Sequence, residues 1–216
     1  MTDKLVFYNG NTPREVQIKD INDNLHNTRG PANVIFHAAS YTRIFFYFKD
    51  KKHNKFRPAY FLYNKGILNK IIWYKYGKKH NDIYPANYEF YKNGNIKCIN
   101  FIKNDSFYRD KLPDEFLFYK DGTLKSENCN IGIYGFPNDR GIFPAQKNYY
   151  KTGHLQSIFY QKYGVFYNKN NKYCCIFYKN SNKKNVKYYE IYLKNKFIKY
   201  QTPKELNKII KYNNID

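Results

Sequence analysis

The stretch His80-Asn81-Asp82-Ile83-Tyr84-Pro85-Ala86 decides the fold, because the chain repeats it. The pattern His-Asn-x-x-x-Pro-Ala also occupies residues 53–59 and 26–32, so its copies start 27 residues apart, and shortened forms follow at Pro113-Asp114 and Pro144-Ala145. A constant spacing of this length is typical of repeat proteins, in which each repeat is one supersecondary unit. We therefore interpret the chain as a repeat array.

A second pattern, Tyr-x-x-Gly-x-Leu/Ile, follows each proline within five or six residues. Its copies occupy residues 63–68, 91–96, 119–124 and 150–155, and Phe36 and Tyr178 hold the tyrosine position in outer copies that lack the glycine. Asn-Gly and Asp-Gly between strand-like runs are typical of tight β-hairpins, which need positive φ angles. Each copy thus predicts one hairpin turn.

A third pattern closes each unit with a two-residue turn that follows an aromatic run such as Phe45-Phe46-Tyr47-Phe48. The turn pairs are Lys49-Asp50, Tyr76-Gly77, Asn104-Asp105, Tyr134-Gly135, Tyr163-Gly164 and Lys194-Asn195. Short connections make neighbouring strands antiparallel. We predict an all-β fold: an elongated antiparallel meander of about six β-hairpin repeats over residues 26–195, with a period of about 27–31 residues.

The two ends should form caps. Residues 1–25 are expected to be an N-terminal cap or an extra strand pair, and residues 196–216 a C-terminal cap with a short helix over residues 203–212. Thr202 and Glu205 form a capping-box pattern, and Pro203 suits the first helical position. Three apolar residues would form the buried stripe of this helix: Leu206, Ile209 and Ile210.

The composition leaves two explanations of charge open. The formal net charge is +21, from 38 Lys and Arg against 17 Asp and Glu. Such a balance indicates a polyanionic partner, either nucleic acid or an anionic membrane. The excess of Phe, Tyr, Ile, Asn and Lys, the residues of A/T-rich codons, also indicates a codon bias, which would explain the positive charge without any binding partner.

Aromatic residues reach 20%, with 25 Tyr and 18 Phe, which favours rings laid on pleated strands over an aliphatic core.

Catalytic motifs are absent from the sequence, which contains no Gly-x-Ser-x-Gly, P-loop, His-Glu-x-x-His or dinucleotide fingerprint. We therefore expect no enzyme activity, no cofactor and no small-molecule substrate. His26, His53 and His80 lie one repeat apart, too far to share a zinc ion, so each ring should pack in a turn and hydrogen-bond backbone. No metal site is predicted.

The chain is expected to be an intracellular protein. Its N-terminus lacks a sustained apolar stretch, and no run approaches the roughly 18–20 apolar residues of a membrane span. Cys98, Cys129, Cys174 and Cys175 lack CxxC spacing and are interpreted as reduced thiols. The expected location is the cytoplasm, which for a viral protein means the host cytoplasm or the virion.

Several segments resemble MORN-type repeats, and more closely their Tyr-x-Asn-Gly-x-Leu-Lys-x-Glu variants. They are Tyr-Lys-Asn-Gly-Asn-Ile-Lys at 91–97, Tyr-Lys-Asp-Gly-Thr-Leu-Lys-Ser-Glu at 119–127 and Tyr-Tyr-Lys-Thr-Gly-His-Leu-Gln at 149–156. The His-Asn-x-x-x-Pro-Ala element is similar to repeats of phage and giant-virus proteins, best at Leu25-His26 and Gly30-Pro31-Ala32. The likeness covers about residues 25–195, although the usual MORN unit is shorter and richer in glycine. It implies elongated hairpin sheets that act as scaffolds, protein-binding surfaces or, in some cases, lipid binders. The A/T-rich composition favours a large DNA virus as the source, with an A/T-rich protist or bacterium as the alternative.

Three hypotheses of function follow. The first is a scaffold for protein–protein interaction, in one form a subunit of a viral assembly, with Trp73, Tyr74 and Tyr47 as hot spots on an exposed aromatic face. The second is nucleic-acid binding without sequence specificity, through tyrosines interleaved with Lys51, Lys52, Lys78 and Lys79. The third is an anionic-membrane adaptor that uses the same lysines.

Overall fold

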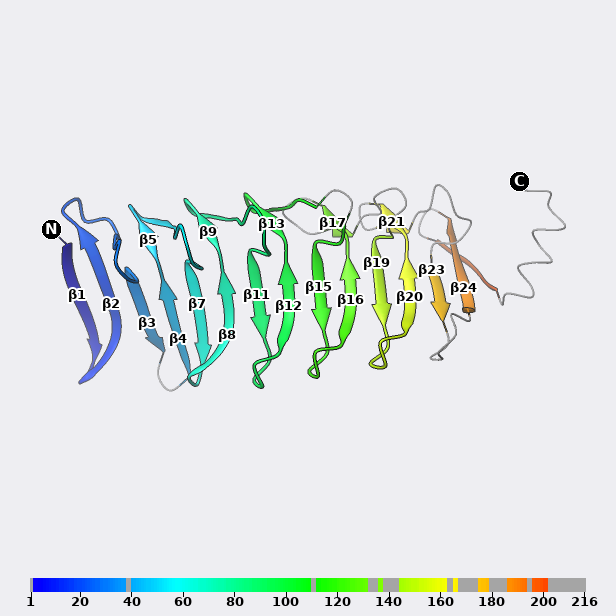
Figure 1. Ribbon diagram of the computed structural model, residues 1–216, viewed down its shortest axis with the longest axis horizontal. Coiled ribbons are helices and arrows are strands. Elements are labelled where there is room, and N and C mark those ends of the chain that lie inside the picture. Colours follow the sequence, from blue (N-terminus) through cyan, green and yellow to red (C-terminus); the bar gives the residue numbers. More distant parts are fainter. Residues whose placement is uncertain are drawn as a thin grey trace. The chain divides into compact units, whose positions relative to one another are not determined.

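The computed structural model of the chain describes residues 2–37, 40–109, 112–131, 136–137, 144–162, 165–166, 175–178, 186–193 and 196–201 (Figure 1). Every regular element within these ranges is a β-strand, so the all-β prediction is confirmed for them. The helix predicted over residues 203–212 lies outside the described residues, as do the turn pairs at 134–135, 163–164 and 194–195. None of the described residues forms a helix with the length and apolar character of a membrane span.

The chain divides into two compact units. Unit 1 comprises residues 1–106 with 120–122, and unit 2 comprises residues 107–119 with 123–216. The main strands of unit 1 pair in the order of the sequence: β1 (Thr2–Asn9), β2 (Thr12–Asp20), β3 (Asn33–His37), β4 (Tyr41–Phe45), β7 (Tyr60–Asn64), β8 (Ile67–Ile72), β11 (Asn87–Phe90) and β12 (Ile96–Asn100). Every pairing between them is antiparallel, so unit 1 is a meander. The strand pair expected within residues 1–25 is present as β1 and β2.

Unit 2 repeats this arrangement. Its main strands are β15 (Glu115–Phe118), β16 (Leu124–Asn128), β19 (Gln146–Tyr149), β20 (Leu155–Phe159), β23 (Cys175–Tyr178), β24 (Val186–Leu193) and β25 (Lys196–Gln201). They also pair antiparallel in chain order. Both units are therefore antiparallel meanders of hairpins, as the repeats predicted.

Small hairpins interrupt the meander at the end of each second strand, a feature that the sequence interpretation missed. They are β5 (Tyr47–Phe48) with β6 (Lys51–Lys52), β9 (Tyr74–Lys75) with β10 (Lys78–Lys79), β17 (Asn130–Ile131) with β18 (Phe136–Pro137), and β21 (Gln161–Lys162) with β22 (Val165–Phe166). Two further short strands are β13 (Ile102–Lys103) and β14 (Ser106–Phe107).

The break in each run has a physical cause in the backbone hydrogen bonds. The Trp73 N–H donates to the carbonyl of Ala86 at 2.8 Å, and the Trp73 carbonyl accepts from the His80 N–H at 3.1 Å. Phe46 does the same with Ala59 and His53, at 2.9 and 3.0 Å. One residue thus connects the main hairpin to the small hairpin and to the loop of the next repeat.

The small-hairpin turns confirm the predicted turn pairs. Lys49 and Asp50 have φ angles of 48° and 59°, and the pairs Tyr76-Gly77 and Asn104-Asp105 also have positive φ at both residues. Two positive φ angles are the mark of a type I′ turn, whose twist matches that of the strands. The main-hairpin turns differ: Lys65 and Gly66 both have positive φ, whereas at Asn93-Gly94 only the glycine does. A strand bulge lies beside each of these two turns.

The fully buried side chains are small. Ala32, Ala59, Ala86 and Ala145 of the Pro-Ala motif are at most 1% exposed, and Cys98, Cys129, Cys175, Ser126 and Ser157 are also buried. Most of the described strand tyrosines and phenylalanines are half-buried on the sheet faces instead. The rings therefore lie on the sheet faces, and the motif alanines are among the most deeply buried of the described residues.

Candidate interaction surfaces

One apolar row crosses the whole sheet of unit 1. Each member is the cross-strand partner of the next, from β1 to β12, in the order Val6, Val16, Val34, Ile44, Phe61, Ile71, Tyr88 and Ile99. All of them are half-buried. Because cross-strand partners point to the same side of a sheet, these side chains form one continuous surface, which we call the apolar face.

A second row continues this face toward the hairpin turns. Residues two positions along a strand share a face, which places Phe36, Thr42, Tyr63, Phe90 and their partners Leu68 and Ile96 beside the first row. Phe36 and Ile96 are 39% and 37% exposed. None of the residues named in these two rows is a lysine, an arginine or a carboxylate. Arg14, two positions before Val16 in β2, lies at the edge of the apolar face and lines the same cleft as Phe36.

The opposite side of the same strands, the polar face, carries charges. Its cross-strand row runs Glu15, Ile35, Arg43, Leu62, Lys70 and Glu89. Glu89 Oε1 lies 2.8 Å from Lys70 Nζ, and its Oε2 lies 3.4 Å from Lys97 Nζ. Burial raises the pKa of Glu89, but the hydrogen bond and charge of Lys70, with those of Lys97, outweigh burial and hold the pKa below its ordinary value. Part of the positive charge of unit 1 is thus neutralised on this face.

Trp73 belongs to the apolar face. Its indole packs on Tyr88 with ring centroids 5.6 Å apart, and Phe46 packs likewise on Phe61 at 6.1 Å. Tyr88 and Phe61 are members of the first row. The residues at the breaks therefore extend the apolar face toward the small hairpins.

Tyr47 and Tyr74, the other two predicted hot spots, lie on the polar side. Each pairs across its small hairpin with a lysine, Tyr47 with Lys52 and Tyr74 with Lys79. Lys52 Nζ lies 5.2 Å from the ring centroids of both Tyr74 and Phe45. Phe45 follows Ile44 in β4 and so points away from the apolar face. The structure thus separates Tyr47 and Tyr74 from Trp73, which the sequence had grouped on one surface.

The cluster around Lys52 is partly desolvated, as its pKa shifts show. Burial, followed by the nearby charge of Lys79, lowers the pKa of Lys52. Burial is also the main cause that raises the pKa of Tyr74 to about 12, with Tyr60, Asp105 and Tyr47 contributing. The Lys52 ammonium therefore contacts aromatic rings of its own chain. Lys51 and Lys78, in contrast, are exposed to solvent.

The repeated histidines connect one repeat to the turn of the next. Nδ1 of His26, His53 and His80 accepts the backbone N–H of Lys49, Tyr76 and Asn104, at 3.4, 3.4 and 3.3 Å. The His53 ring also stacks on Tyr76, with centroids 4.3 Å apart. The prediction that these rings pack in turns and bond backbone is confirmed. No three His, Cys, Asp or Glu side chains of the described residues are grouped to hold a metal ion.

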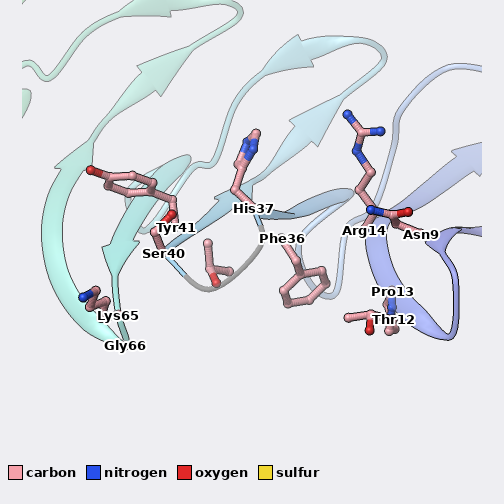
Figure 2. Close-up of a pocket in the computed structure, with 11 residues that line it drawn as sticks. Asn9, Thr12, Pro13, Arg14, Phe36, His37, Ser40, Tyr41, Lys65 and Gly66 are labelled. Atoms are coloured by element: carbon pink, nitrogen blue, oxygen red, sulfur yellow. The ribbon is translucent and has the colours of Figure 1, made fainter.

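An open cleft of about 840 Å³ lies at the hairpin-turn end of unit 1. Arg14, His37, Tyr41 and Lys65 are among its lining residues, and the described lining contains no carboxylate. Figure 2 shows Arg14 and Lys65 at opposite sides of the cleft, with side chains that do not converge on a common point. The arrangement does not position a nucleophile, base and acid together.

The central row of unit 2 differs from that of unit 1. Its cross-strand order is Phe116, Glu127, Lys147, Ile158 and Ile176. Glu127 Oε2 and Lys147 Nζ form an ion pair at 3.5 Å in the middle of the row. The uninterrupted apolar surface is therefore a property of unit 1.

Sequence reasoning expected an exposed aromatic face that includes Trp73, but it did not identify the rows that make up the apolar face, although part of their signal was present. Asn87-Tyr88-Glu89-Phe90 alternates polar and aromatic residues, as a strand with two different faces should. The pairing register decides which faces of neighbouring strands join, and it depends on bulges such as that between Glu89 and Phe90.

Compared with known proteins, the chain matches no protein-family model and no curated protein sequence.

Proposed function

We propose that this protein is a non-enzymatic repeat scaffold that binds another protein chain through the apolar face of unit 1. One observation carries the proposal: eight strands present a continuous cross-strand row without a charged residue, from Val6 to Ile99. Contiguous apolar surface of more than a few hundred Å² is uncommon on monomeric soluble proteins and marks interaction sites.

The aromatic members of this face suit a binding role. Trp73, Tyr88, Phe61 and Phe46 form two ring pairs on it. Large rings bury much area at low entropic cost and are enriched among the residues that dominate binding energy. Trp73 is therefore retained as an anchor, whereas Tyr47 and Tyr74 belong to a different surface.

We further propose that the hairpins are MORN-type repeats and that the protein is a subunit of a viral assembly in the host cytoplasm or the virion. The constant repeat spacing and the Tyr-x-x-Gly turns support the first part. The A/T-rich residue usage supports the viral source.

The scaffold proposal is tested with two variants of β7, each of which places one carboxylate on a different face of the sheet. Phe61→Glu puts a carboxylate in the apolar row, and Leu62→Glu, the matched control, puts it next in sequence on the polar face between Arg43 and Lys70. Affinity capture with native mass spectrometry should find complexes of the intact chain and of Leu62→Glu that Phe61→Glu loses. If the intact chain forms no complex of any kind, the proposal fails.

A second candidate, nucleic-acid binding without sequence specificity, is favoured by the small hairpins. Two of them gather six lysines: Lys49, Lys51, Lys52, Lys75, Lys78 and Lys79. Phosphate contacts by lysine weaken steeply as salt rises. Filter binding to random DNA and RNA should then fall with salt and fall further in Lys51→Glu/Lys78→Glu. Undetectable binding at low salt would exclude it, and binding only to acidic vesicles would indicate the membrane adaptor.

A further inference from the structure

We infer that the occupant of the apolar face is a second copy of this chain, so that two unit 1 sheets pack face to face about a two-fold axis. The inference rests on the proposed scaffold function and identifies its partner. Two packed sheets that bury one apolar side each are a common solution for such a face.

The charge distribution selects this partner. With a net charge of +21, two copies repel each other wherever their lysines meet. The two rows of the apolar face contain no lysine or arginine, whereas Arg43, Lys70 and Lys97 lie on the polar face and further lysines lie on the small hairpins. Pairing of apolar face with apolar face therefore keeps these cations out of the interface.

The size of the face is sufficient. Strands about 4.8 Å apart and about 17 Å long make a row across β1 to β12 roughly 34 Å wide, or roughly 600 Å² per copy. Two copies would bury about 1,200 Å², the lower end of the range for specific, stable interfaces. The dimer should accordingly be of moderate affinity.

The middle of the row fixes where the axis lies. Ile44 and Phe61 are cross-strand partners with three row members on either side, Val6, Val16 and Val34 before them and Ile71, Tyr88 and Ile99 after them. A two-fold pairing uses the same patch on both copies, so full overlap brings Ile44 and Phe61 of one copy over those of the other. A charge at Phe61 thus meets its own equivalent near the axis.

Complementary charge variants test the geometry. Sedimentation velocity over a concentration series should show the intact chain and Leu62→Glu as dimers. Phe61→Glu and Phe61→Lys, each alone, should weaken dimerisation on the order of 30-fold, the effect expected of a central hot spot. Mixed one to one, these two variants should form the heterodimer in native mass spectrometry, which also shows that both fold.

Two results would overturn the inference: an intact chain that stays monomeric at every concentration, or variants that remain monomeric when mixed. Failure of the inferred dimer can be distinguished from failure of the proposed scaffold function. A monomeric chain that captures a different protein, through Phe61 and not Leu62, keeps the scaffold and rejects the second copy. A chain that captures nothing rejects both.

Discussion

The two units have the same hairpin fold, but the central cross-strand row of unit 1 has no charged side chain, whereas that of unit 2 has two. In unit 1 the inter-hairpin pairs Ile44–Phe61 and Ile71–Tyr88 are apolar, whereas in unit 2 one described inter-hairpin pair of the row, Glu127–Lys147, is charged and another, Ile158–Ile176, is apolar. Both keep the antiparallel register, so an exposed sheet face does not need apolar residues to form. The apolar residues of unit 1 are therefore better explained by what covers that face than by the stability of the sheet.

A second difference concerns the motif itself. Asp114 of unit 2 stands where other repeats carry alanine, and it is fully buried. Its carboxylate accepts the Asn130 backbone N–H at 3.2 Å and the Asn130 side-chain amide at 3.2 Å. Ile102 holds the place of Asn130 in unit 1, because the Ala86 N–H donates to the Asn100 carbonyl as the Asp114 N–H donates to the Asn128 carbonyl. The repeat tolerates a buried acid where a donor has been added with it.

The largest effect is expected from moving this acid into unit 1. Ala86→Asp buries a carboxylate at a position that is 0% exposed, and Ile102 lacks the side-chain amide that Asn130 donates to Asp114, which leaves its backbone N–H as the one donor in common. A buried charge that lacks one of its partners costs about 3–5 kcal/mol. Urea denaturation followed by circular dichroism should show a loss of that size in the free energy of unfolding.

The double variant Ala86→Asp/Ile102→Asn is the matched control, because it restores the donor found in unit 2. It should recover about 1.5–3 kcal/mol, the net value of a hydrogen bond to a charged group. Equal stability of the single and double variants would show that Asn130 does not compensate Asp114.

The next largest effect, on self-association, is expected from exchanging the central inter-hairpin pairs of the two units. Ile71→Glu/Tyr88→Lys gives unit 1 the ion pair of unit 2, and should weaken self-association by about 2 kcal/mol, as for a hot spot, with little change in fold. Glu127→Ile/Lys147→Tyr gives unit 2 an apolar row and should strengthen association. Sedimentation velocity measures both. If the first double variant associates as strongly as the intact chain, the row is not the contact surface.

Predictions of local turn geometry from the sequence were confirmed, whereas the arrangement that depends on longer-range hydrogen bonds was not foreseen, for a physical reason. Local geometry was predictable: Tyr76-Gly77 encodes a type I′ turn, and the motif histidines bond the following turn. The small hairpins were not, since they depend on hydrogen bonds of Phe46 and Trp73 to alanines 13 residues further along the chain. The division of Trp73 and Tyr74 between the faces follows the alternation of consecutive strand residues, which the grouping of both on one surface had ignored. Only the placement of residues from different strands on a common face required the pairing register, which depends on the positions of the bulges.

A smaller effect is expected at the histidines, which unit 2 replaces at its first repeat with Tyr108. His53→Ala removes the acceptor of the Tyr76 N–H and the stack on the Tyr76 ring, so the free energy of unfolding should fall by about 1–2 kcal/mol. His37→Ala, at an exposed position outside the repeat series, is the control. Equal losses in both variants would mean that the repeated ring has no special role.

The same histidine gives a pH dependence. Burial, then the charge of Lys75, lowers the pKa of His53 below 6.5, in agreement with a ring nitrogen that accepts an N–H. The unfolded chain therefore binds the proton first, so the stability from His53 is present above pH 6.5 and is lost as pH falls through this range. His53→Ala should flatten the acid side of the stability profile.

The smallest effect is expected at Tyr74, in the Lys52 cluster on the polar side. Its pKa is raised from 10.0 to about 12, chiefly by burial, so the folded chain holds this proton more tightly than the unfolded chain. The contribution of Tyr74 is complete below pH 10 and is lost as pH rises from 10 to about 12. Tyr74→Phe should therefore lose less stability over that interval than the intact chain, while the lysines, common to both proteins, cancel in the comparison. Because the Tyr74 side chain is only half-buried, solvent screens the difference, which should stay below about 1 kcal/mol in urea denaturation. An identical alkaline profile for the two proteins would mean that the ring beside Lys52 is open to water, and would leave this cluster accessible to a partner after all.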